Sequence, residues 1–113
     1  MSYQVVAAID GKLVSIFDGE TEYRLGCKVL ARRGTPGKVP MDCCFFSWAT
    51  EREAKVAVFP ASSKLLHAPR VLIALRATAC TYVDKKNPHK LAHEEVYVER
   101  IVAFRTANVW HTC

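Results

Sequence analysis

The fold is decided by a stretch that passes from strand to helix, CCFFSWATEREAKVA at residues 43–57. Its first six residues are mostly apolar and aromatic, which is typical of a buried strand. Thr50 can accept a hydrogen bond from the backbone N–H of Glu53, while the Glu53 side chain reaches back to the N–H of Thr50, the reciprocal pattern of a capping box. The helical pattern that follows ends at Pro60. We therefore expect a strand that is followed at once by the main helix, at about residues 50–59.

The rest of the chain has the patterns of strands. Asp10-Gly11 separates two β-rich runs and supplies the positive φ angles of a type I′ hairpin turn. Near-continuous apolar residues in 70–83 predict a central strand. Arg100 interrupts the apolar face of the last strand, so either a bulge turns it outward, which we favour, or it is buried with a partner. The class is α+β: a mainly antiparallel sheet of about six strands with one main short helix packed on one face.

Length and loop composition predict one domain. A chain of 113 residues has the size of a single domain, so residues 1–113 are expected to share a core. Residues 32–42 contain two glycines, two prolines and several basic residues, which predicts a flexible basic loop. Residues 106–113 are expected to form a C-terminal tail.

Composition predicts a globular protein outside membranes. Half of the residues are apolar and about a quarter are charged, unlike the composition of disordered chains. No apolar run has the roughly 18 residues that span a bilayer. The first residues lack the features of a signal peptide, and the five cysteines have no framework spacing, so we expect them to be reduced. These features predict a cytoplasmic location.

The positive charge is concentrated in the second half of the chain. Residues 1–60 carry eight Lys/Arg against seven Asp/Glu, and residues 61–113 carry eight against four. A basic half favours nucleic acid, phosphate-bearing ligands or anionic surfaces, and the alternative is a solvated surface with a positive bias. Arginine offers paired donors to phosphate or carboxylate groups, and tryptophan can stack on a ring. The candidate ligand-binding residues are Arg70, Arg76, Lys85, Lys86 and Trp48.

Two histidines have a spacing that occurs in zinc sites. His89 and His93 would share one face of a helix. Pro88 and its polar neighbours instead indicate a loop, and the sequence identifies no third ligand. We therefore expect no metal site and no cofactor.

Three short pieces resemble the arginine–serine–glutamate class of ADP-ribosyltransferases: EYRLG at 22–26, FSWAT at 46–50 and EEVYV at 94–98. The resemblance implies that Arg24 contacts the phosphates of NAD and that Ser47 organises the nicotinamide pocket. It implies that Glu95 stabilises an oxocarbenium-like ribose, because a carboxylate stabilises positive charge that develops beside it. The serine triplet and the two-glutamate motif of that class are incomplete in this chain.

Three functional hypotheses follow from these patterns. The first is a binding or interaction module for a protein or a phosphate-bearing ligand, which uses basic loops and a sheet edge. The second is an ADP-ribosyltransferase-like enzyme, active or degenerate, which requires Arg24, Ser47 and Glu95 to converge on one cleft. The third is nucleic-acid binding, which requires one continuous basic face. An exposed edge strand would allow a homodimer by strand pairing as well as a monomer.

Overall fold

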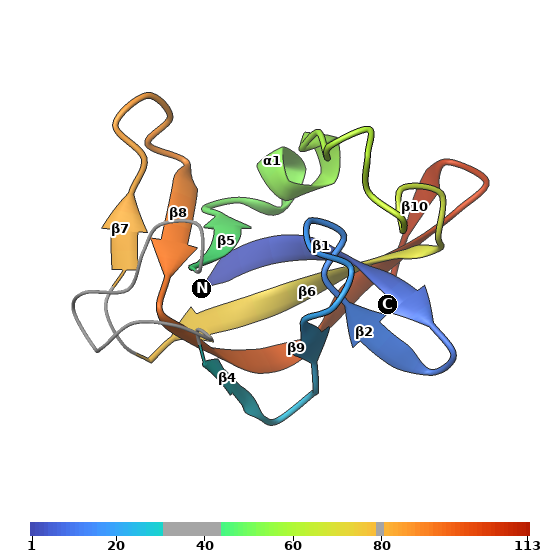
Figure 1. Cartoon of the computed structure of the whole chain (residues 1–113), viewed down its shortest axis with the longest axis horizontal. Coiled ribbons are helices and arrows are strands. Elements are labelled where there is room, and N and C mark those ends of the chain that lie inside the picture. Colours follow the sequence, from blue (N-terminus) through green and yellow to red (C-terminus); the bar gives the residue numbers. More distant parts are fainter. Residues whose placement is uncertain (31–43, 79–80) are drawn as a thin grey trace.

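Five consecutive buried residues, 71–75, identify the centre of the sheet. They belong to β6 (Arg70–Ala77), which lies between β1 (Ser2–Ile9) and β9 (Glu95–Thr106) and is antiparallel to both (Figure 1). The coordinates are a computed structural model, which describes residues 1–30, 44–78 and 81–113. Because a central strand is covered on both faces, it has a near-continuous apolar run, and the predicted central strand is confirmed for residues 70–77. Thr81–Val83, at the end of the predicted range of 70–83, instead belongs to a separate strand at the edge of the sheet.

Seven strands form one path in the order β10-β9-β6-β1-β5-β8-β7. The strands not yet introduced on this path are β10 (Val109–Thr112), β5 (Phe45–Trp48), β8 (Lys90–His93) and β7 (Thr81–Val83). Three short strands branch from it: β2 (Lys12–Val14) beside β1, β3 (Glu22–Tyr23) beside β2, and β4 (Lys28–Leu30) beside β9. The described residues thus form ten strands, not the expected six. A period-two pattern needs at least four residues, so strands of two or three residues escape it.

The first hairpin turns as the sequence predicts. Asp10 and Gly11 have φ angles of 49° and 77°, and Ile9 pairs with Lys12 across the two-residue turn. Positive φ at both central residues is the type I′ geometry, whose twist matches that of the flanking strands.

The helix α1 (Glu51–Val56) is shorter than the expected 50–59. The backbone N–H of Glu53 donates to the Thr50 hydroxyl, which confirms the cap. The Glu53 carboxylate accepts from that hydroxyl rather than from the Thr50 N–H, so only half of the capping box forms. The chain becomes extended at Ala57, which lets Phe59 reach the core while Val58 is 88% exposed. Packing of one aromatic ring therefore outweighs the local helical pattern.

Two bulges bend β9. Its pairing with β6 shifts by one residue between Leu72 and Ile73, and again between Ala74 and Leu75. Arg100 is exposed beside these shifts, as predicted. The bulges also separate apolar residues that simple alternation places on one face: Val98 packs in one core cluster and Val102 in another.

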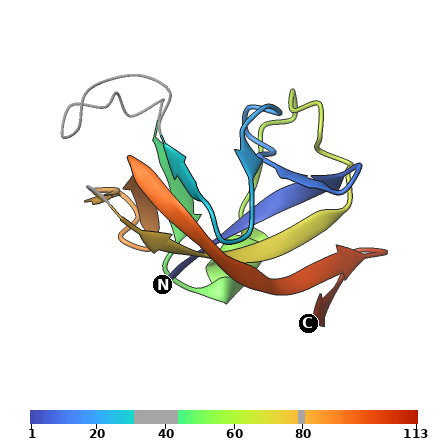
Figure 2. The same cartoon turned by 90° about the horizontal axis from the view of Figure 1, so that it is seen from below.

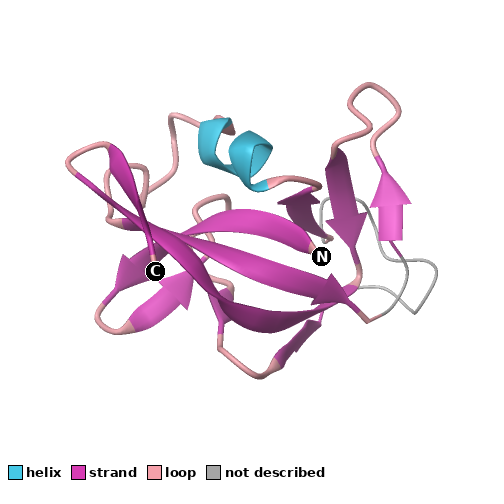
Figure 3. Cartoon of the chain, turned by 180° about the vertical axis from the view of Figure 1, so that it is seen from behind, coloured by secondary structure: helices cyan, strands magenta, loops and turns pink. Residues whose placement is uncertain are grey.

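The two core clusters involve different sets of elements. Ala54 of α1 and Phe59 pack with Leu72 in one cluster. In the other, Tyr23 of β3 and residues of β5, β6 and β9 pack together. Figure 2 shows the strong twist of the central strands. Figure 3 shows α1, the one helix among the described residues, beside the sheet.

Two expectations about loops have different outcomes. Residues 32–42 lie outside the described residues, so the flexible-loop prediction stays a prediction. Residues 106–113 do not form a tail, because Val109–Thr112 pairs with β9 as strand β10. The turn before it uses Ala107 and Asn108 at positive φ, without the glycine that would have indicated a hairpin. In the described part of the chain, no helix has the length and apolar character needed to cross a membrane.

Candidate anion-binding pocket

Two half-buried arginines lie opposite each other on the central strands. Arg70 at the start of β6 and Arg105 near the end of β9 are direct cross-strand partners. Among the described residues, no ion pair joins either guanidinium group to a carboxylate. Burial lowers the pKa of Arg70, and the positive charge of Arg105 lowers it further. Because like charges directly opposite each other destabilise a sheet, an unneutralised pair suggests a role other than stability.

The two bulges in β9 create this juxtaposition. At the other end of the pairing, Ala77 lies opposite Val96. Continued without a bulge, that register would place Ala103 opposite Arg70. Each bulge adds one residue to β9, so Arg105 takes the position instead.

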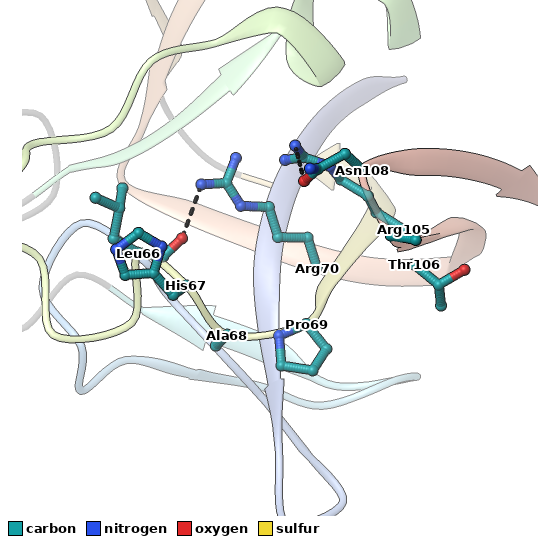
Figure 4. A pocket seen from close by; sticks show the side chains of 9 residues that line it. Leu66, His67, Ala68, Pro69, Arg70, Arg105, Thr106 and Asn108 are labelled. Carbon is teal, nitrogen blue, oxygen red and sulfur yellow. Dashed lines mark hydrogen bonds between the residues drawn. The ribbon is translucent and has the colours of Figure 1, made fainter.

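Neutral oxygen atoms hold both guanidinium groups. The Arg70 Nη2 donates to the carbonyl oxygen of Leu66 at 3.0 Å, and its guanidinium lies 5.1 Å from the centre of the Phe59 ring. The Arg105 Nη2 donates to the Asn108 Oδ1 at 2.9 Å. Figure 4 shows these two hydrogen bonds on either side of the pocket. Each guanidinium has five N–H donors, so these contacts orient both groups while other donors stay available to a ligand.

The arginines line a pocket of about 530 Å³. This volume is within the range of roughly 300–1,000 Å³ that is usual for small-molecule sites. The walls combine apolar side chains with the two arginines, a histidine and hydrogen-bonding groups, and the lining contains no carboxylate. The lining residues are Leu66, His67, Ala68, Pro69, Arg70, Arg105, Thr106, Ala107 and Asn108.

One wall is a loop that is anchored to the sheet. The hydroxyl of Ser63 donates to the carbonyl oxygen of Ile16. The N–H of Ala8 donates to the carbonyl oxygen of Pro69 at 2.8 Å, immediately before Arg70. Leu65 and Leu66 pack against the core cluster beneath the loop. These contacts fix the backbone carbonyl that orients Arg70, so the wall is preformed.

Only Arg70 of the predicted ligand-binding residues lines this pocket. Arg76 lies six residues further along β6, roughly 20 Å away by strand geometry, and pairs with Glu99 at 2.9 Å. Lys85 and Lys86 are exposed between β7 and β8, at the opposite edge of the sheet from β10. Trp48 is half-buried against the core. Sequence reasoning did not identify Arg105, because only the bulged register makes it a partner of Arg70.

The three residues of the transferase hypothesis have separate partners. Arg24 is exposed and its Nε lies 3.4 Å from a carboxylate oxygen of Glu22. Glu95 accepts from the Thr78 hydroxyl at 2.7 Å and pairs with Lys28, and these contacts lower its pKa.

Ser47 belongs to a buried network around His93. The Ser47 Oγ lies 2.5 Å from His93 Nε2, and the Thr81 Oγ1 lies 2.9 Å from Nδ1. Ser2 approaches Nε2 at 3.5 Å. Burial lowers the pKa of His93 to about 4, so its imidazole is neutral at pH 7. The network joins strands β1, β5, β7 and β8.

The two histidines with zinc-like spacing have different environments. His93 is 1% exposed, whereas His89 is exposed and contacts the Glu53 carboxylate at 3.2 Å. Within the residues that the structure describes, no three His, Cys, Asp or Glu side chains are grouped to hold a metal ion.

Comparison with protein-family models, with curated proteins and with solved structures finds no match for this chain. A function for this chain is therefore inferred from the chemistry of the pocket.

Proposed function

We propose that the chain is a binding module that holds a small phosphate-bearing ligand between Arg70 and Arg105. The observation that carries this proposal is the opposed arginine pair, which has no carboxylate partner among the described residues. An anion between the two guanidinium groups would remove their repulsion and accept charge-assisted hydrogen bonds from both. The anchored loop and the oriented side chains would reduce the ordering cost of binding.

The shape of the site supports a small ligand rather than a nucleic acid. The two arginines lie in a pocket whose walls include Leu66, Ala68 and Pro69, so the ligand would combine a phosphate with an organic group. The other basic residues predicted to bind a ligand, Arg76, Lys85 and Lys86, lie outside the pocket. Arg76 already pairs with the carboxylate of Glu99. Nucleic-acid binding would instead use a basic track that follows a phosphate backbone.

Calorimetry with phenyl phosphate tests the proposal, with phenol as the uncharged control ligand. We expect phenyl phosphate to bind and phenol not to bind. Replacement of either pocket arginine, Arg70→Gln or Arg105→Gln, should weaken binding at least tenfold. Arg76→Gln is the matched control, because it removes the same charge from the same strand outside the pocket.

Two results would contradict the proposal. The first is an absence of phenyl phosphate binding to the folded wild-type chain. The second is an equal loss of affinity in Arg76→Gln and the two pocket variants, which would indicate a general effect of net charge. A thermal shift by phenyl phosphate provides an independent readout, since a ligand of the native state raises the melting temperature.

A further inference from the structure

The hairpin between β9 and β10 turns through two residues with positive φ angles, and neither of them is glycine. Thr106 pairs with Val109, and Ala107 and Asn108 between them have φ angles of 47° and 63°. Asparagine visits this left-handed region more readily than most residues, whereas alanine meets a steric penalty there. A glycine at position 108 would satisfy the turn as well as asparagine does. The backbone conformation therefore accounts for asparagine or glycine at position 108 but does not distinguish between them.

The side chain of Asn108 does have a partner in the pocket. Its Oδ1 accepts from the Nη2 of Arg105 at 2.9 Å, and both residues line the cavity (Figure 4). An aspartate would fit the same turn and accept the same hydrogen bond, but its charge would cancel that of Arg105. A neutral acceptor orients the guanidinium and keeps the full positive charge. Leu66 does the same for Arg70 with a backbone carbonyl.

Because Arg70 and Arg105 both keep their full positive charge, they restrict the class of ligand that the pocket can bind. A phosphate monoester carries a charge between −1.5 and −2 near pH 7 and offers three terminal oxygen atoms. A phosphodiester has one negative charge and two terminal oxygens, and a carboxylate also has one charge. Only the monoester supplies nearly one negative charge for each of the two guanidinium groups.

We propose that Asn108 is a positioning residue that orients Arg105 through a neutral acceptor and so makes the pocket selective for phosphate monoesters. This inference rests on the proposed function of the pocket. Asn108 aligns the arginine that meets the phosphate, and the Ala107–Asn108 turn holds the carboxamide within reach of it.

Three substitutions separate binding from stability. Asn108→Gly suits the positive φ angle and removes the acceptor, so the melting temperature should stay constant or rise while methyl phosphate affinity falls about three- to tenfold. Asn108→Asp keeps the turn and the hydrogen bond but neutralises Arg105, so affinity should fall more than tenfold without a loss of stability. Ala107→Gly is the matched control, in which the melting temperature should rise by a few degrees and affinity should not change.

The measurement is a calorimetric titration of each folded variant with methyl phosphate and with dimethyl phosphate, together with a thermal melt. We expect the wild-type chain to prefer methyl phosphate at least tenfold, and the Asp variant to lose this preference. Wild-type affinity for methyl phosphate in Asn108→Asp would overturn the inference. So would a loss of affinity in all three variants that follows their melting temperatures, because that pattern indicates a purely structural turn.

The outcome for the arginine variants separates the two proposals. If Arg70→Gln and Arg105→Gln abolish binding while Asn108→Asp binds normally, only the role of Asn108 is wrong. If the wild-type chain binds no phosphate monoester, both proposals are wrong.

Discussion

Lowering the pH from 7 to 5 should destabilise the folded chain through one buried histidine. His93 hydrogen-bonds to the hydroxyls of Ser47 and Thr81, neither of which carries a charge. Burial lowers its pKa from 6.5 to about 4. Between these two values the unfolded chain binds a proton that the folded chain does not. The free energy of unfolding therefore falls as the pH drops through this window, and the contribution of His93 levels off below about pH 4.

The size of the effect follows from the change in pKa. At about 1.4 kcal/mol for each pH unit, the full change from 6.5 to about 4 corresponds to an upper value of ~3 kcal/mol. Between pH 7 and pH 5, after allowance for solvent screening, we expect ~1–2 kcal/mol. Glu95 has a lowered pKa and loses its stabilising contribution only as the pH falls below its ordinary value of 4.5. The window above pH 5 is therefore dominated by His93.

Urea unfolding at intervals of half a pH unit measures this dependence. His93→Gln should be less stable than wild type at pH 7 but should lose most of the slope between pH 7 and 5. His67→Gln, which replaces an exposed histidine, should keep that slope. NMR titration of the imidazole resonances of the wild-type chain gives the same answer without a substitution. A titration midpoint for His93 near 6.5, or a flat stability profile from pH 7 to 5, would refute the reasoning.

Three further predictions concern stability. Thr50→Ala removes the helix cap, and urea unfolding should show a loss of about 1 kcal/mol, whereas an unchanged midpoint would contradict the capping role. Leu72→Ala empties a fully buried position on β6 and should cost ~2–5 kcal/mol in the same assay; less than ~1 kcal/mol would argue against a packed core there. Arg76→Gln breaks an exposed ion pair with Glu99 and should change stability by less than ~1 kcal/mol, which thermal melts in low and high salt would check.

Several elements could be predicted from the sequence because each is formed by residues that are neighbours in the chain. Asp10-Gly11 suits a two-residue turn whatever surrounds it, and Thr50 caps a helix three residues from its partner. The apolar run in β6 indicated a central strand because burial on both faces removes polar residues. The end of the helix was not predictable in the same way, because Phe59 leaves the helical path to pack beside Phe17, 42 residues earlier in the chain.

The candidate site also combines a feature that the sequence predicts with one that depends on distant parts of the chain. The basic character around Arg70 made it a candidate from the sequence, but Arg76, Lys85 and Lys86 were equally basic and lie elsewhere. The hydrogen-bond partners of His93 also come from three other strands, so the spacing of His89 and His93 could not identify them.

The amino-acid pattern was enough to specify the mainly antiparallel α+β class, the central strand, the first turn and the helix cap, since each depends on residues close together in the chain. The pairing of Arg70 with Arg105 depends instead on the assembled sheet. Two bulges in β9 set that register. The alternation of apolar residues does not show where a strand contains an extra residue, so this register could not be predicted from the sequence. The pocket depends on this long-range pairing, because its two charges come from strands that meet only after the sheet has formed.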